Sequence, residues 1–186
     1  MTDLEKPPIR ILVADDEDAI LDAYREVFAS VVPSTNANTL RDLKAKLFGN
    51  TTPAVSSAPV FNVHCCRDAE QAVVAVTTAL NGGQPYSVIF LDMRMPPGPD
   101  GAWAAARIRE SDPHVDIVIA TAYSDVDPRQ ITAQVPPEEK LFYVQKPFHP
   151  HEIRQLALAL GRSQWVLENQ LRQLAHYDSL TGLPNR

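Results

Sequence analysis

Apolar residues along this chain gather in short blocks that predict five buried strands. The blocks are rich in β-branched and aromatic residues, and each ends abruptly at a polar or turn-forming residue. They lie at Ile9–Ala14, Val60–Cys66, Val88–Asp92, Asp116–Thr121 and Leu141–Gln145. Helical segments separate them, and connections of this length favour parallel strands. The pattern therefore predicts an α/β fold with a doubly wound, five-stranded parallel sheet.

The segments between the strands carry apolar stripes at helical spacing. The predicted inward residues of the first helix are Ala19, Ile20, Tyr24, Val27 and Phe28. Those of the second helix, which has Asp68 as its N-cap and runs to about Leu80, are Ala72, Val73, Val76 and Leu80. An alanine-rich helix is predicted at Gly101–Glu110, and a short helix begins at Asp127-Pro128.

Two segments depart from this alternation. Residues 31–59 are rich in Ser, Thr, Asn and Pro but contain an amphipathic stretch, which predicts an inserted short helix after the first helix. The last helix opens at Pro150, and an apolar repeat extends it to about His176. The repeat falls at seven-residue intervals, on Ile153, Leu160, Leu167 and Leu174. A coiled-coil seam and a stripe that packs on the domain both fit this repeat.

Composition narrows the class of protein. The chain has 186 residues, of which 45% are hydrophobic, enough for one domain with an appendage. A net charge of −6 argues against a nucleic-acid partner. Adjacent Cys65 and Cys66 suit neither a disulfide framework nor a zinc site. Because no stretch approaches the apolar length of a membrane span, we expect a cytoplasmic protein without a membrane partner.

Polar side chains follow the predicted strands at their carboxyl ends. Asp15 and Asp16 come after the first strand, Asp92 ends the third, Thr121 ends the fourth, and Lys146 follows the fifth. In an open α/β sheet these ends share one edge, where ligands bind. Oxygen ligands at close quarters suit Mg²⁺, and Mg²⁺ with a lysine and a hydroxyl suits a phosphoryl group. The sequence therefore predicts a site for magnesium and phosphate.

The motifs ILVADDE, FLDMRMP, ATA and VQKPF, in this order, resemble those of the receiver domain of two-component response regulators. The resemblance covers Ile9 to about Leu160. It implies that Asp92 is the phosphoacceptor, which takes phosphate from a sensor histidine kinase or a phosphotransfer protein. Asp16, Asp92 and the backbone carbonyl of Arg94 would ligate Mg²⁺, while Asp15 would act through water.

The same resemblance assigns roles to three further residues. Thr121 and Tyr143 would form the switch pair, and Lys146 would bind phosphate and precede a cis proline. Two features depart from the family pattern, namely the inserted residues 31–59 and the loop MPPGPDG after Asp92, which is one residue longer than usual.

The tail HYDSLTGLPNR resembles the start of GGDEF domains, the diguanylate cyclase family. We therefore expect a receiver domain at 1–150, a linker helix at 151–176 and the start of a truncated GGDEF domain at 177–186. A longer parent protein would then signal through cyclic-di-GMP, while this fragment itself would lack cyclase activity. The activity of that missing domain stays open.

Two other readings compete with the phosphoacceptor. One is a Mg²⁺-dependent phosphohydrolase of the haloacid dehalogenase type, a family whose nucleophile lies in a D-x-D motif on the first strand. The adjacent pair Asp15-Asp16 and the single acid on the third strand disfavour it. The other is a phosphorylation-independent dimerisation module. If the chain forms a homodimer, we expect it to associate through the receiver surface and the helix from Pro150 to His176.

Overall fold

The fold is a parallel sheet with helices on both faces, seen in residues 7–29, 59–122 and 128–176, which the computed structural model describes. The strands are β1 (Ile9–Ala14), β2 (Phe61–Cys66), β3 (Val88–Asp92), β4 (Asp116–Thr121) and β5 (Leu141–Gln145). All pairings are parallel, and the order across the sheet is β2-β1-β3-β4-β5. The predicted five-stranded parallel sheet is confirmed, with β2 beginning one residue later than expected.

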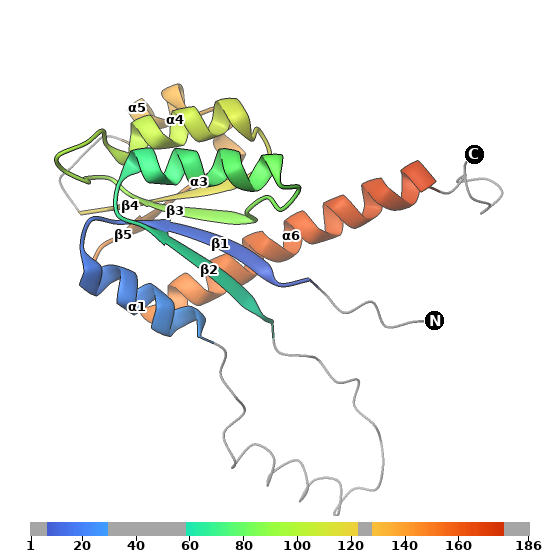
Figure 1. Cartoon of the computed structure of the whole chain (residues 1–186), viewed down its shortest axis with the longest axis horizontal. Helices are drawn as coiled ribbons and strands as arrows, with labels where there is room; N and C mark the ends of the chain where they lie inside the picture. The colour runs from blue at the N-terminus through green and yellow to red at the C-terminus, as the bar shows by residue number, and fades with distance from the viewer. Residues whose placement is uncertain (1–6, 30–58, 123–127, 177–186) are drawn as a thin grey trace, which may run out of the picture.

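Helices cover the two faces in unequal numbers (Figure 1). One face carries α1 (Asp18–Phe28) and α6 (Pro150–His176). The other carries α3 (Ala69–Asn81), α4 (Gly101–Ser111) and α5 (Pro128–Gln134), and the short 3-10 helix η1 (Glu138–Lys140) leads into β5. The chain leaves β1 toward β2 on one side and returns to β3 on the other. The order of strands therefore reverses beside β1, which opens a crevice at the carboxyl ends of β1 and β3.

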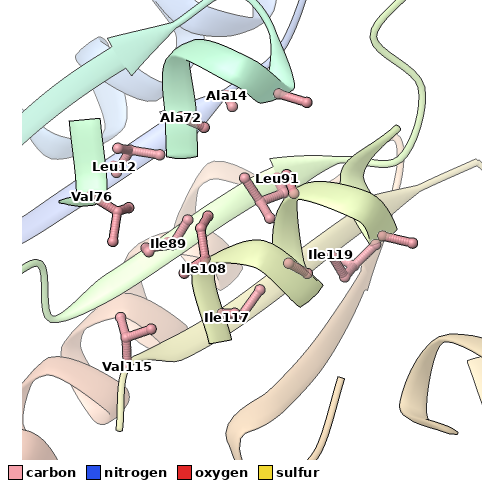
Figure 2. Close-up of a cluster of buried hydrophobic side chains, with 14 of the residues drawn as sticks. Leu12, Ala14, Ala72, Val76, Ile89, Leu91, Ile108, Val115, Ile117 and Ile119 are labelled. Atoms are coloured by element: carbon pink, nitrogen blue, oxygen red, sulfur yellow. The ribbon is translucent and has the colours of Figure 1, made fainter. Parts of the chain in front are cut away.

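The sheet's interior strands are buried on both faces. Every residue of β3 is buried, and five of the six in β4 are. Alternate side chains from β1, β3 and β4 meet α3 and α4 in the cluster of Figure 2, which includes Leu12, Ile89, Leu91, Ile117 and Ile119. Burial on both faces explains why these strands read as continuous apolar runs rather than as alternating patterns.

The inward face of α1 differs from the one predicted. Leu21, Tyr24 and Phe28 are buried, whereas Ala19 is exposed. Ala19 lies two positions before Leu21, about 200° around the helix. The prediction of Tyr24 and Phe28 was right, and that of Ala19 was wrong because the spacing i, i+3, i+7 starts from Leu21.

The last helix has the predicted bounds, Pro150–His176. The first two positions of its seven-residue repeat, Ile153 and Leu160, are buried in the cluster shared with α1 and β1. Those two positions therefore pack on the domain. Side chains beyond Ser163, the predicted helix within 31–59 and the tail at 177–186 lie outside what the structure describes. No helix in the described part of the chain combines the length and apolar character needed to cross a bilayer.

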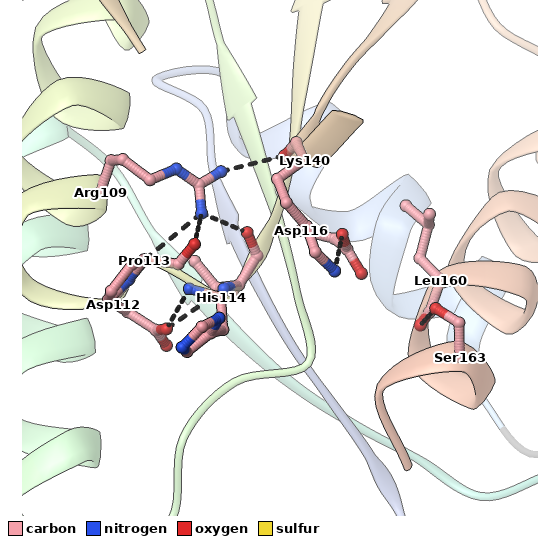
Figure 3. Close-up of polar contacts among 9 residues, drawn as sticks. Arg109, Asp112, Pro113, His114, Asp116, Lys140, Leu160 and Ser163 are labelled. Carbon is pink, nitrogen blue, oxygen red and sulfur yellow. Dashed lines mark hydrogen bonds and ion pairs between the residues drawn. The ribbon is translucent and has the colours of Figure 1, made fainter. Parts of the chain in front are cut away.

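A buried arginine ties together the amino-terminal edge of the sheet. Arg109 of α4 is 7% exposed. Its guanidinium donates hydrogen bonds to four backbone carbonyls, those of Asp112, Pro113, Val115 and Lys140 (Figure 3). This contact joins the turn before β4 to the turn before β5. The contact could not be predicted from the sequence, because an arginine in an alanine-rich helix is more often a surface residue.

Candidate functional site

The pairing of β1 with β3 brings the predicted acids together. Ala14 of β1 lies opposite Leu91 of β3, and the next residue along each strand is an acid. Asp15 and Asp92 therefore lie side by side at the carboxyl edge of the sheet. One carboxylate oxygen from each of Asp15, Asp16 and Asp92 lies within 4.8 Å of the others. The expected convergence of three acids is therefore confirmed in position.

Asp15 is the most deeply held of the three. The residue is 1% exposed. Its Oδ1 accepts a hydrogen bond from the amide of Glu17 at 3.0 Å, and its Oδ2 lies 2.7 Å from the ammonium of Lys146. Burial raises the pKa of this carboxyl above its usual value, although Lys146 and the Glu17 amide oppose the shift. Both oxygens of Asp15 are thus engaged inside the protein.

Asp92 has a similar pair of contacts but lies nearer the solvent. Its Oδ1 lies 2.7 Å from the ammonium of Lys146, and its Oδ2 accepts from the amide of Arg94 at 3.2 Å. The side chain is 11% exposed, compared with 2% for Asp15. Among the carboxylates bonded to Lys146, Asp92 is the one that a molecule from solution reaches first.

Lys146, which directly follows β5, contacts two of the acids. Its backbone amide donates to the carbonyl of Thr121 at 2.8 Å, which joins the ends of β4 and β5. Burial alone would lower the pKa of the ammonium, but hydrogen bonds with Asp15 and Asp92 outweigh burial and raise it. The Lys146–Pro147 peptide bond is cis, as the family resemblance implied.

The charges of this cluster do not balance. Among the described residues, the carboxylates of Asp15, Asp16 and Asp92 gather here, and the ammonium of Lys146 contacts those of Asp15 and Asp92. An oxygen-only donor set with excess negative charge fits a hard divalent cation such as Mg²⁺. The backbone amide of Arg94 points at Asp92, while a metal-binding role for its carbonyl stays a prediction.

The predicted switch residues lie at the ends of neighbouring strands. Thr121 is partly buried at the end of β4, and its hydroxyl donates to the carbonyl of Ala122 at 2.9 Å. Tyr143 lies on β5 opposite Ile119, and its hydroxyl is 3.0 Å from the hydroxyl of Thr132 on α5. Tyr143 is therefore linked to α5, and its coupling to Thr121 stays a prediction.

The loop after Asp92 is fastened at both ends. The amide of Met93 donates to Ala120 at 2.9 Å, and the amide of Gly101 donates to the carbonyl of Met93 at 3.2 Å. Asp100 caps α4 by accepting from the amide of Trp103. The Pro96–Pro97 peptide bond within this longer loop is cis. The sequence predicted Gly101 only as the start of a helix, yet it lies against the backbone of Asp92. The Pro-Asp-Gly turn that precedes the helix was the one sequence signal for a close approach at this position.

Comparisons with known proteins point to one family. Residues 50–158 match the family described as "Response regulator receiver domain". The chain is 27% identical over 122 residues to the transcriptional regulatory protein AruR of Pseudomonas aeruginosa, covering 66% of this chain and 44% of AruR. It is 34% identical over 83 residues to the oxygen regulatory protein NreC of Staphylococcus haemolyticus, covering 40% of this chain and 33% of NreC. The chain thus spans less than half the length of these curated relatives.

Solved structures share the fold at low sequence identity. A receiver domain protein of the CheY-like kind from Methanospirillum hungatei JF-1 superposes with a TM-score of 0.59 at 14% identity, over 87% of this chain and 99% of that one. A structure titled adenylate cyclase from Rhodopirellula baltica gives 0.60 at 21% identity, over 90% and 97%. The N-terminal domain of a three-domain response regulator/sensory box/GGDEF protein from Carboxydothermus hydrogenoformans gives 0.54 at 16%, over 87% and 98%.

Proposed function

The chain belongs to the response regulator receiver domain family, and on this premise we propose that Asp92 is the phosphoacceptor of a two-component signalling pathway. The donor is a phosphohistidine, carried by a sensor histidine kinase or by a phosphotransfer protein. The observation that supports this choice is the position of Asp92, which contacts Lys146 and whose side chain is 11% exposed, compared with 2% for Asp15. Asp15 shares the contact with Lys146 but is enclosed.

The proposed reaction is a direct displacement at phosphorus. An oxygen of the Asp92 carboxylate attacks the phosphorus atom, the P–N bond breaks, and the histidine nitrogen keeps the bonding electrons. The product, an acyl phosphate, adds negative charge beside Asp15 and Asp16. The Lys146 ammonium, already 2.7 Å from Asp92, offsets that charge without having to move into place. Thr121, at the end of the adjacent strand, is the proposed hydroxyl donor to a phosphoryl oxygen.

The acid cluster fits the Mg²⁺ that the family resemblance implies. Asp16 and Asp92 would hold it directly with the backbone carbonyl of Arg94, and Asp15 would help through water. When bound, the ion supplies neutralisation of the transferring phosphoryl group. The support for this proposal is the gathering of three carboxylates at this edge of the sheet.

We further propose that the receiver controls a GGDEF output. The support is the sequence of the tail, together with the solved N-terminal domain of a GGDEF protein that shares this fold. The domain boundaries proposed are 1–150 for the receiver, 151–176 for the linker helix and 177–186 for the start of the GGDEF domain. The parent protein would be a diguanylate cyclase in the cytoplasm. Two chains would associate through the receiver and α6. Phosphorylation would change that association through Thr121 and Tyr143.

A phosphodonor experiment separates the proposed function from its alternatives. The protein is incubated with Mg²⁺ and a small phosphodonor such as acetyl phosphate, and the mass of the protein and the release of inorganic phosphate are followed together. A receiver gains one phosphoryl group per chain and releases phosphate slowly. A phosphohydrolase releases many equivalents without retaining one, and a dimerisation module does neither.

A further inference from the structure

We infer that Gly101 is a positioning residue for Asp92, whose lack of a side chain lets α4 rest directly on the backbone of the phosphoacceptor. The inference rests on the proposed function of Asp92. Neither the sequence motifs nor the comparisons assign such a role to Gly101. It concerns the steric fit between the first residue of α4 and the last residue of β3.

The space beside Gly101 is filled by backbone atoms. A Cβ placed on Gly101 would overlap the carbonyl oxygen of Asp92, and it would lie 3.0 Å from the carbonyl carbon of Asp92 and 3.3 Å from the Cα of Met93. A flexible side chain could turn away from such a clash, but backbone within a sheet cannot. Either α4 or the end of β3 must move to admit even an alanine.

Conformational freedom is not the reason for glycine here. Among the described glycines, Gly83 alone has a positive φ. Gly101 is the first residue of α4, where alanine is the better helix former. A helix that needed only its intrinsic propensity would therefore gain from Gly101→Ala. Space beside Asp92, not backbone flexibility, is what favours glycine.

Displacement at this point would reach the Asp92 carboxylate. The amide of Gly101 donates to the carbonyl of Met93, and the amide of Met93 donates to Ala120 on β4. The next amide, of Arg94, donates to Oδ2 of Asp92. The Met93 carbonyl and the Arg94 amide belong to one peptide group, so this group connects α4 to the Asp92 carboxylate. A shift of α4 would therefore change the direction in which Asp92 faces Lys146. A misplacement of about 1 Å can cost about a hundredfold in rate.

Gly161 offers a matched control. It lies in α6, and a Cβ there would stand 2.5 Å from Cγ2 of Ile9, a side-chain atom at the opposite end of β1 from the acids. Gly161→Ala therefore adds the same methyl group to a helix and forces a close contact far from Asp92. It should lower stability without altering the geometry of the acid site.

The test compares wild type, Gly101→Ala and Gly161→Ala. Phosphorylation by acetyl phosphate with Mg²⁺ is measured by mass, per folded molecule, with an osmolyte present so that all three proteins stay folded. We expect the rate to fall at least about tenfold in Gly101→Ala and to remain unchanged in Gly161→Ala. Equal rates in all three proteins would overturn the inference while leaving the proposed function of Asp92 intact.

A second readout does not depend on phosphorylation. Amide ¹H–¹⁵N shifts of Met93, Arg94 and Lys146 should move in Gly101→Ala but not in Gly161→Ala. If wild type accepts no phosphate, the proposed function fails, and these shifts still decide whether Gly101 positions Asp92. Unmoved amide signals at those three residues in Gly101→Ala would contradict the positioning role.

Discussion

The ammonium nitrogen of Lys146 lies 2.7 Å from Oδ1 of Asp92, at the ends of two strands that are separated in the sheet by β4. The same nitrogen lies 2.7 Å from Oδ2 of Asp15. Lys146 thus holds two acids together that would otherwise repel each other across the crevice. Its ammonium contacts two of the three acids that would form the proposed Mg²⁺ site, so we expect lysine and cation to compete in part for these carboxylates.

This competition predicts the behaviour of Lys146→Met. Without metal, the variant should lose about 3 kcal/mol of folding free energy, because Asp15 and Asp92 lose their counter-charge. Added Mg²⁺ should stabilise the variant more than it stabilises wild type, since the ion takes over the neutralisation. Urea unfolding with and without Mg²⁺ measures both effects.

The control for that experiment is Lys140→Met. Lys140 forms an ion pair with Asp116 at the other edge of the sheet, with Nζ and Oδ1 2.9 Å apart. Its loss should lower stability without changing the response to Mg²⁺. Identical stabilisation of both variants by Mg²⁺ would show that Lys146 does not compete for the acid site.

A second prediction concerns the hydroxyl of Tyr24. This buried group has no hydrogen-bond partner among the described residues, and the rings of Phe28, Phe90 and Phe148 surround it. Burial raises the pKa of Tyr24, with Asp15 and Asp92 adding to the shift. Tyr24→Phe removes an unpaired polar group and should raise the free energy of unfolding by about 1 kcal/mol.

Tyr86→Phe is the matched comparison. The Tyr86 hydroxyl lies 2.6 Å from Nδ1 of His64, so its removal breaks a hydrogen bond and should lower stability by about 0.5–1 kcal/mol. Both variants are measured by urea unfolding. A loss of stability in Tyr24→Phe as large as in Tyr86→Phe would mean that the Tyr24 hydroxyl is hydrogen-bonded in solution.

The third prediction is a pH dependence from Asp116, which is 1% exposed. Burial raises its pKa, although Lys140 and Arg109 oppose the shift. A carboxyl whose pKa is higher in the folded state binds its proton more readily there. Its contribution to stability is therefore complete below the unfolded pKa of about 3.9 and is lost as the pH rises through the folded value.

Asp116→Asn removes this titration. Relative to the variant, wild type should become more stable as the pH falls from 7 to 4, and urea unfolding across that range measures the difference. Lys140→Met should steepen the trend, because it removes a charge that opposes burial. A stability difference between wild type and Asp116→Asn that does not vary with pH would contradict the raised pKa.

The strands could be predicted closely because their physical signals are local. In β3 and β4 a buried apolar run ends at a polar residue, Asp92 in one case and Thr121 in the other. The inward face of α1 could be predicted only in part, because helical spacing admits more than one stripe. Whether Leu21 or Ala19 faces the sheet depends on how the helix is rotated against β1, which is a tertiary property.

The position of the site residues could be predicted from the topology of the sheet, whereas the contacts between them could not. Parallel strands bring their carboxyl ends to one edge, so the meeting of Asp15, Asp92 and Lys146 could be predicted from the chain alone. The double contact of Lys146 and the burial of Asp15 could not, because they depend on distances between strand ends. The carbonyl contacts of Arg109 and the tight fit of Gly101 are likewise set by packing between elements that are distant in sequence.

Intact-mass measurement shows whether Asp92 accepts the phosphoryl group. Wild type, Asp92→Ala and Asp15→Ala are incubated with acetyl phosphate and Mg²⁺, and peptide mapping locates any phosphate. Wild type should carry one phosphoryl group, on Asp92, and Asp92→Ala should carry none. Stoichiometric phosphate on Asp92→Ala, or on a residue other than Asp92 in wild type, would contradict this prediction.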